Sequence, residues 1–269
     1  MQYDPIKNSF ARIVKRNTLF RRLFYKALGM MFLREWYVKR KIKELYKASP
    51  PEQIFDAGSG FGQYSYFMAR NFRKANLLSV DVKEDQIEDC RYFFKKIGYN
   101  NCEFRTGDLT KLDEDNKFDF ILSVDVMEHI EDDAGVFKRF FNALRKNGRV
   151  LINTPSNLGG SDAHDEEDES FIGEHVRIGY SKDDICSKLK AAGFEIESFE
   201  YTYGKWGSRY WKLGIKYPML MLNKSKLLFI ILPFYYLFTI WFVWLFMKLD
   251  IIEKNKKAGT GILVVGLKS

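Results

Sequence analysis

One short segment limits the folds that are open to this chain. An apolar run that ends in Asp56 reads as a strand, and a turn with three glycines, Gly58, Gly60 and Gly62, follows it at once. A side chain at Gly58 or Gly60 would collide with a ligand that approaches the backbone closely. Such a turn belongs at the carboxyl edge of a parallel sheet. The segment therefore predicts an α/β fold with a ligand site at that edge.

The pattern along the rest of the chain agrees with this prediction. After Pro51, short apolar runs alternate with amphipathic segments, which is typical of βαβ units and a mainly parallel sheet. The clearest helix covers residues 133–144, where apolar side chains recur on one face. Strands are predicted at residues 53–56, 76–81, 102–105, 118–124, 149–154, 194–201 and 261–267.

Composition excludes several other classes of protein. The chain has 269 residues, of which 46% are hydrophobic and only 6 are proline, so it can bury a core and is neither disordered nor collagen-like. Cys90, Cys102 and Cys186 lie far apart without a CxxC pair, which excludes a disulfide framework and a cysteine zinc site. This use of cysteine favours a cytosolic compartment.

The glycine spacing separates two kinds of nucleotide site. Dinucleotide-binding folds require a glycine three residues after the second one, where this chain has Gln63. The spacing D-x-G-x-G-x-G instead resembles motif I of the class I S-adenosylmethionine-dependent methyltransferases. The resemblance continues at Asp81, at the Gly107-Asp108-Leu109 turn, and at the fourth and last strands. A Rossmann oxidoreductase or a non-catalytic nucleotide binder shares only the first two of these signals.

The resemblance implies a fold and a cofactor site. It implies a Rossmann-like seven-stranded sheet whose last strand is antiparallel, formed by residues 51–203 and 260–269. It also implies that the Asp81 carboxylate holds the ribose hydroxyls of S-adenosylmethionine and that Asp108 meets the adenine amino group. The cofactor-binding residues implied in this way are Asp56, Gly58, Ser59, Gly60, Gly62, Asp81, Val82, Gly107, Asp108, Leu109 and Ser123.

The segment after the fourth strand carries the candidates for catalysis. Asp125, Glu128 and His129 have the spacing that places side chains on one turn of helix. They are similar to the acid-x-x-Glu-His segment of the O-methyltransferases of ubiquinone biosynthesis, which implies a divalent cation near an acceptor hydroxyl. A histidine base or a metal would remove the hydroxyl proton. The alternative is that Glu128 and His129 only brace the turn between strand and helix.

An acidic stretch follows the fifth strand. Six acids occur in the eight residues 162–169, and Gly173 to Arg177 follow shortly afterwards. In the resembled family this connection lies over the acceptor site, which makes it a lid candidate. His164 and His175 are further candidates for metal binding or catalysis, against the alternative of a solvated loop.

The basic charge of the chain is concentrated in its first 50 residues. They hold thirteen Lys or Arg and three acids, and bulky apolar residues are interleaved at helical spacing. A basic amphipathic helical arm suits an anionic membrane surface. The alternatives are a helical cap that packs on the domain and a nucleic-acid site. The membrane surface is the preferred interpretation, so a nucleic-acid partner is not expected. The arm lacks the uninterrupted apolar run of a signal peptide, so export is not expected.

A second addition precedes the last strand, over residues 204–259. Residues 227–247 carry no charge and include nine aromatics, and a helix of that length would reach roughly 31 Å. The strands on either side belong to one sheet, so the chain must leave and return on one side. This predicts a helical hairpin lying in one leaflet, with a kink at Pro233. A buried helix or an apolar dimer interface is the alternative.

Tryptophan follows the same division, because all five residues lie in the two additions and none in the sheet region between them. They are Trp36, Trp206, Trp211, Trp241 and Trp244. Tryptophan favours the headgroup level of a bilayer. The sequence thus predicts methyl transfer from S-adenosylmethionine to a lipophilic acceptor, most simply a hydroxyl of a prenylated phenol or quinol, at the cytoplasmic face of a membrane. A soluble substrate and cofactor binding without turnover are the rival hypotheses.

Overall fold

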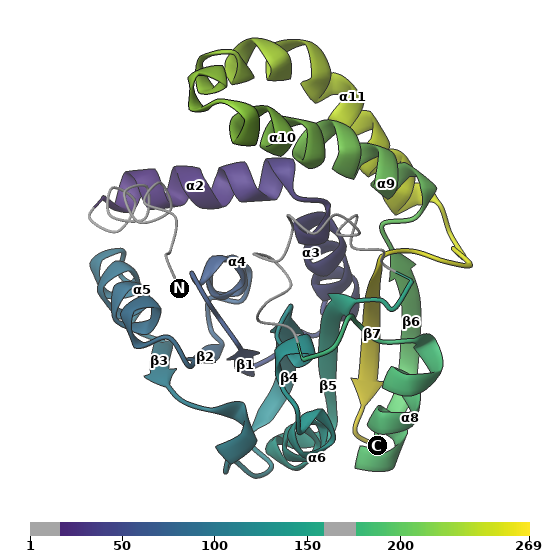
Figure 1. Ribbon diagram of the computed structural model, residues 1–269. Coiled ribbons are helices and arrows are strands. Elements are labelled where there is room, and N and C mark those ends of the chain that lie inside the picture. Colours follow the sequence, from purple (N-terminus) through teal and green to yellow (C-terminus); the bar gives the residue numbers. More distant parts are fainter. Residues whose placement is uncertain (1–16, 159–175) are drawn as a thin grey trace.

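A computed structural model of the protein describes residues 17–158 and 176–269, in which seven strands form one sheet (Figure 1). The order across the sheet is β3-β2-β1-β4-β5-β7-β6. The strands are β1 (Gln53–Ala57), β2 (Asn76–Asp81), β3 (Cys102–Thr106), β4 (Phe118–Val124), β5 (Leu144–Pro155), β6 (Glu195–Thr202) and β7 (Gly261–Leu267).

The pairing pattern confirms the predicted fold. Strands β1 to β5 pair in parallel, whereas β7 runs antiparallel to both β5 and β6. The carboxyl ends of the parallel strands therefore meet at one edge of the sheet. The glycine turn after β1 and the ends of β2 and β4 all lie at this edge.

Four predicted strands have different bounds in the structure, of which β1 and β3 each end one residue later than predicted. Strand β5 starts five residues earlier than expected, because Leu144 already pairs with Phe118 before the chain makes its turn at Asn147, whose φ is +62°. Strand β6 covers Glu195–Thr202 instead of residues 194–201, so it is shifted by one residue at each end.

One face of the sheet is covered by α6 (Asp133–Ala143) and α8 (Lys182–Ala192). The apolar stripe of α6 includes Val136, Phe137 and Phe140, which are fully buried against the inward side chains of the strands. Helix α6 starts at the Asp132 side chain, which accepts a hydrogen bond from the Gly135 N–H. At the edge of this face the buried Asp133 carboxylate of α6 accepts a hydrogen bond from the Tyr180 hydroxyl at 2.7 Å.

The opposite face is covered by α3 (Leu33–Leu45) and α4 (Gln63–Asn71). Leu33, Tyr37, Val38 and Ile42 of α3 are fully buried, so this part of the arm packs on the sheet as the helical-cap alternative predicts. Beside them, α2 (Thr18–Met31) contributes Tyr25 to a third cluster with α5 (Glu84–Lys96).

Between β6 and β7 the chain forms the predicted helical hairpin, which extends beyond the carboxyl end of the sheet (Figure 1). One arm joins α9 (Lys205–Trp211), a π-helical turn (Lys212–Lys216) and α10 (Tyr217–Lys224). A 3₁₀ turn (Lys226–Ile230) leads into the other arm, α11 (Leu232–Ile252). Pro233 lies in the first turn of α11, where its missing N–H costs nothing, so the predicted kink there is wrong.

Helix α11 is apolar and long enough to cross a membrane by length and composition, with 17% of its most apolar window buried inside the protein. Its outer side chains include Phe234, Leu237, Phe238, Trp241 and Phe242, each more than half exposed. The helix is therefore not the buried core helix that was the alternative. An apolar dimer interface remains a competing use for this surface.

Candidate functional site

The glycine turn is shaped by its own chain as well as by space for a ligand. Gly58 has a φ of +82°, and a Cβ there would lie 2.2 Å from a methyl group of Val126. Gly60 has a φ of +50°, and a Cβ there would come no closer than 3.7 Å to any other group, at Gln86. The predicted need for glycine at residue 58 thus has an internal cause, whereas Gly60 borders open space at the edge of the sheet.

The arm closes the back of this turn. A Cβ at Gly62 would lie 2.9 Å from the Cys90 sulfur and 3.5 Å from the Tyr25 hydroxyl. Arg21 is only 2% exposed, and its Nη2 donates to the Phe61 carbonyl at 2.9 Å while Nη1 pairs with Asp89 at 2.6 Å. Helix α2 is therefore bonded directly to the glycine turn.

Asp56 supports the turn from below. Its carboxylate is 2% exposed and accepts a hydrogen bond from the Ser65 hydroxyl of α4 at 2.5 Å. The pKa of Asp56 is raised to about 7, mainly by burial and to a lesser degree by the nearby Asp81, while the hydrogen bond from Ser65 opposes the rise. Asp56 thus joins β1 to α4 rather than projecting from the edge.

Asp81 occupies the predicted place at the end of β2. Its Oδ2 accepts from the Gly60 N–H at 2.8 Å, and its Oδ1 accepts from the Lys83 N–H at 2.9 Å. Two backbone N–H groups therefore fix the carboxylate beside the open side of Gly60. The half-buried carboxylate keeps the capacity to accept further hydrogen bonds from a pair of hydroxyls.

The third strand ends in the predicted turn. The Gly107 N–H donates to the Asp81 carbonyl at 3.0 Å, which brings the two turns together. Asp108 caps the short 3₁₀ helix η1 (Leu109–Lys111), and its hydrogen bonds from Thr110 hold the pKa of this exposed carboxyl below its usual value. Leu109 is buried beneath it, whereas the Val82 side chain is 65% exposed at the same edge.

Two hydroxyls at this edge are buried without a partner among the described residues. They belong to Ser59 in the glycine turn and to Ser123 near the end of β4. A buried hydroxyl without a hydrogen bond is costly, so each is suited to bind a polar ligand. The open side of Gly60, the fixed Asp81 carboxylate and these hydroxyls together fit a ribose-containing cofactor. Contact of the eleven predicted residues with that cofactor stays a prediction.

The predicted helical turn of Asp125, Glu128 and His129 is absent. Asp125 has a φ of +51°, so the chain leaves β4 in a left-handed conformation before the 3₁₀ helix η2 (Met127–His129). A 3₁₀ turn points successive side chains about 120° apart. Glu128 is accordingly 1% exposed and His129 is exposed.

Each of the three residues has a different environment. The Glu128 carboxylate accepts from the Thr154 hydroxyl of β5 at 3.0 Å, and burial raises its pKa. This favours a bracing role for Glu128. Asp125 pairs with the Arg34 guanidinium instead of facing its two neighbours. His129 remains the candidate base at the exposed edge.

Within residues 17–158 and 176–269, no three His, Cys, Asp or Glu side chains are grouped to hold a metal ion. Asp125, Glu128 and His129 are thus not grouped as metal ligands in the described residues, and a divalent cation at this site stays a prediction. His164, His175 and most of the predicted acidic lid lie outside the described residues.

Sequence reasoning missed a cluster around Arg34, which lies beyond the end of β4. Arg34, at the start of α3, pairs with Asp125, and its backbone N–H donates to the Tyr203 hydroxyl at 3.0 Å. The Arg34 Nε is buried without a partner in the described part of the chain. No local signal identifies this pair, because 90 residues separate its members and Arg34 looks like any other cation of the basic arm.

The foot of the hairpin contacts the same region. The Tyr210 hydroxyl of α9 donates to the Met31 carbonyl at 2.6 Å, and Trp244 Nε1 of α11 donates to the Met30 carbonyl at 3.0 Å. Both carbonyls lie at the junction between α2 and α3, next to Arg34. The two additions therefore meet beside the Arg34–Asp125 pair.

Known proteins resemble this chain in sequence and in fold. A family model described as a methyltransferase domain matches residues 49–200. Phosphoethanolamine N-methyltransferase 3 of Arabidopsis thaliana is 31% identical over 115 residues, which are 42% of this chain and 23% of that protein. Ubiquinone biosynthesis O-methyltransferase of Pelagibacter ubique is 26% identical over 131 residues, 48% of this chain and 53% of that protein.

The alignments thus span about a quarter to a half of the length of these relatives. Among solved structures, phosphoethanolamine N-methyltransferase 2 of Haemonchus contortus in complex with S-adenosyl-L-methionine has a TM-score of 0.63 and 18% identity, covering 96% of this chain and 60% of that one. At this identity the likeness shows a shared fold.

Proposed function

Because the chain belongs to the methyltransferase domain family and has the fold of the class I S-adenosylmethionine-dependent methyltransferases, we propose that it transfers a methyl group to a lipophilic acceptor at a membrane surface. The sulfonium of bound S-adenosylmethionine would supply the methyl group. In this proposal the Asp81 carboxylate accepts hydrogen bonds from the ribose hydroxyls, and Gly60 leaves room for the methionine portion. The Ser59 and Ser123 hydroxyls face polar atoms of the cofactor.

One observation carries the membrane part of the proposal, and it is the exposed surface of α11. Phe238 is 72% exposed and Trp241 is 69% exposed, on a helix whose foot is hydrogen-bonded to the α2–α3 junction. Contiguous apolar surfaces of this kind mark sites of association. A hairpin that lies in one leaflet would hold the acceptor side of the site against the lipid, on the cytoplasmic face, as a peripheral or monotopic protein.

The acceptor in this proposal is a hydroxyl, most simply that of a prenylated phenol or quinol. Methyl transfer is an in-line displacement, so the hydroxyl must lose its proton as it attacks. The exposed His129 lies beyond the end of β4, where a base would be needed. The similarity to the ubiquinone O-methyltransferase supports a hydroxyl acceptor.

A second candidate function is methylation of an amine on a soluble phosphate ester. The matches to plant phosphoethanolamine N-methyltransferases favour it. In that case the exposed surface of α11 would serve as an anchor or as a dimer interface.

The two candidates are distinguished by their products. We would incubate the protein and S-adenosylmethionine carrying a labelled methyl group with total lipid extract or with the water-soluble metabolite fraction, and identify the labelled product by mass spectrometry. The proposal expects an O-methylated product from the lipid extract, and none with Asp81→Ala. A labelled amine from the soluble fraction would support the second candidate. Cofactor binding without any product would contradict both.

A further inference from the structure

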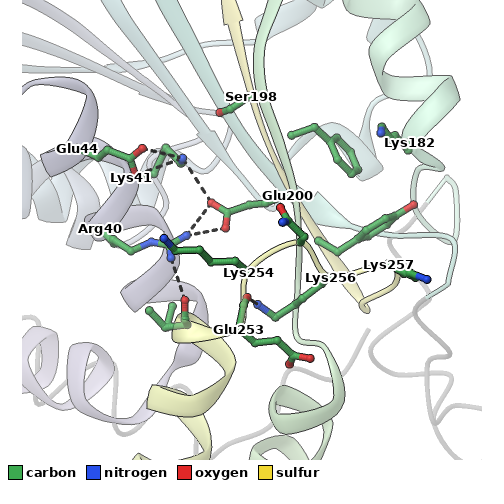
Figure 2. Close-up of a pocket in the computed structure, with 14 residues that line it drawn as sticks. Arg40, Lys41, Glu44, Lys182, Ser198, Glu200, Glu253, Lys254, Lys256 and Lys257 are labelled. Carbon is green, nitrogen blue, oxygen red and sulfur yellow. Dashed lines mark hydrogen bonds and ion pairs between the residues drawn. The ribbon is translucent and has the colours of Figure 1, made fainter.

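A cavity of about 630 Å³ lies away from the cofactor edge, between α3, the edge strand β6 and the segment that follows α11 (Figure 2). Cavities of this size accommodate small organic ligands. The floor is formed by Arg40 of α3 and Glu200 of β6, and Lys254 and Lys257 line the wall that connects α11 to β7. None of these residues belongs to the predicted cofactor or acceptor site.

The floor of the cavity is electrically balanced. Arg40 Nη2 donates to both Glu200 oxygens, at 2.7 and 2.6 Å, and Lys41 lies 3.6 Å from Glu200 and 3.3 Å from Glu44. Two cations thus match two acids there, as the dashed lines in Figure 2 show. The floor leaves no charge for a ligand to neutralise.

The wall of the cavity is not balanced. Lys182, Lys254, Lys256 and Lys257 face it, and Glu253 is the only acid beside them among the lining residues. Lys256 is half-buried, and burial lowers its pKa, with Arg40 lowering it further against the pull of the nearby acids. Lys182, Lys254 and Lys257 are exposed and form no ion pair within the described part of the chain, so a bound anion would supply the missing counter-charge.

The cavity begins where the apolar helix ends. Ile251 lines it, and the neighbouring Ile252, in the last turn of α11, is 59% exposed. The tip of the hairpin lies at the opposite end of α11, away from the sheet (Figure 1). If the tip enters a leaflet, the foot of the helix and the lysines after it lie nearest the phosphate layer.

We infer that this basic cavity binds the phosphate of an anionic phospholipid headgroup. The excess of three cations over acids among the lining residues supports an anionic ligand, and the choice of a lipid as its source rests on the proposed membrane location. This site is separate from the methyl-transfer site, so it would set the preference for a lipid headgroup and leave the chemistry unchanged.

The test uses the full chain and a water-soluble probe, so that it does not depend on membrane docking. Dihexanoyl phosphatidylglycerol below its critical micelle concentration is titrated calorimetrically, with dihexanoyl phosphatidylcholine and inorganic phosphate as comparison ligands. The paired variant Lys254→Gln/Lys257→Gln should weaken binding of the phosphatidylglycerol by about 25-fold, at about 5-fold for each lysine. Glu253→Gln removes the lone acid of the wall and should tighten binding a few-fold.

The matched control is Lys74→Gln/Lys146→Gln, which removes two exposed lysines elsewhere and should leave binding unchanged. Thermal unfolding of each variant reports on the fold. No binding to the wild type, or an equal loss in the control pair, would overturn the inference. Equal affinity for inorganic phosphate would overturn the lipid assignment, and retention of phosphatidylglycerol binding in a protein without methyltransferase activity would leave it standing.

Discussion

The arm and the hairpin have similar compositions but are joined to the sheet in different ways. In the described part of the arm, α3 lies in the core with Tyr37 and Val38 fully buried, and α2 buries Arg21 against the glycine turn. The hairpin buries side chains at its foot, such as Met247 and Asp250, and a few where its two arms face each other, such as Val243, but it exposes the outer side of α11.

The arm therefore stabilises the fold, whereas the exposed side of the hairpin is available for association. Removing the arm would strip one face of the sheet and uncover the cofactor turn. Removing aromatic side chains from the outer side of α11 would change what the protein binds and leave the fold intact. The contrast can be tested, because each region offers both a buried and an exposed version of the same kind of residue.

The largest effect is expected at the exposed face of α11. Replacing Phe238, Trp241 and Phe242 by serine removes three side chains that are each more than half exposed. Burial of one such side chain in the acyl region contributes about 1.5 to 3 kcal/mol. Partition onto liposomes should therefore fall by at least about 10³-fold in a flotation assay, with the unfolding midpoint nearly unchanged.

The control for this variant is Tyr92→Ser/Ile178→Ser, which removes exposed apolar side chains from other surfaces and should not alter partition. If the α11 variant instead loses stability together with partition, the exposed face packs against a second copy of the chain. A concentration-dependent change of mass in the wild type would show this dimer.

The next largest effect is expected inside the arm. Arg21→Met removes a 2% exposed guanidinium that pairs with Asp89 and donates to the Phe61 carbonyl. Breaking a buried pair in this way costs about 3 kcal/mol of unfolding free energy. Arg22→Met, at the exposed neighbouring position, should cost less than about 0.5 kcal/mol. If denaturant titrations gave the same loss of unfolding free energy for Arg21→Met and Arg22→Met, α2 would not be docked on the glycine turn.

Arg21 and Arg22 also show where sequence reasoning stops. The seven strands and the antiparallel last strand were predictable because apolar runs bounded by turn residues are local signals, and Asp81 and Gly60 meet because parallel strands end at one edge. Nothing local distinguishes Arg21 from Arg22, because the difference lies in α5 and the glycine turn, more than 35 residues away.

The prediction of a helical turn at residues 125–129 was wrong for a related reason. The spacing of Asp125, Glu128 and His129 predicts one helical face only if the backbone is helical, and the left-handed φ of Asp125 ends that condition. This conformation accompanies the ion pair with Arg34 and the hydrogen bond from the Asp125 N–H to the Asn153 carbonyl. Both partners are remote in sequence, so the periodicity could not indicate them.

A smaller effect is expected at the foot of the hairpin. Asp250 accepts from the Tyr37 hydroxyl at 2.6 Å and from the Gly207 N–H at 2.8 Å, and so joins both hairpin helices to α3. Asp250→Ala leaves the Gly207 N–H without its partner and should lower the unfolding free energy by about 2 kcal/mol. Tyr37→Phe, which removes one of the two hydrogen bonds, should cost about 1 kcal/mol. A cost in Asp250→Ala no larger than in Tyr37→Phe would contradict an anchoring role for the Gly207 bond.

The smallest effect is expected for exposed cations of the arm, whose contribution to membrane binding should decrease with salt, unlike that of the hairpin. Arg22 and Lys26 are exposed on α2 beside the apolar Leu23. A cation near an anionic surface contributes about 1 kcal/mol, which salt screens. Arg22→Gln or Lys26→Gln should therefore weaken binding to phosphatidylglycerol-containing liposomes by about 5-fold at low salt. Neither variant should change binding to phosphatidylcholine liposomes, and Lys74→Gln should match the wild type on both.

Because the aromatic face of α11 supplies several times more free energy than these two cations, washing with 1 M salt should leave the wild type bound. Release by salt would show that the arm dominates docking and that the contrast between the two regions is reversed.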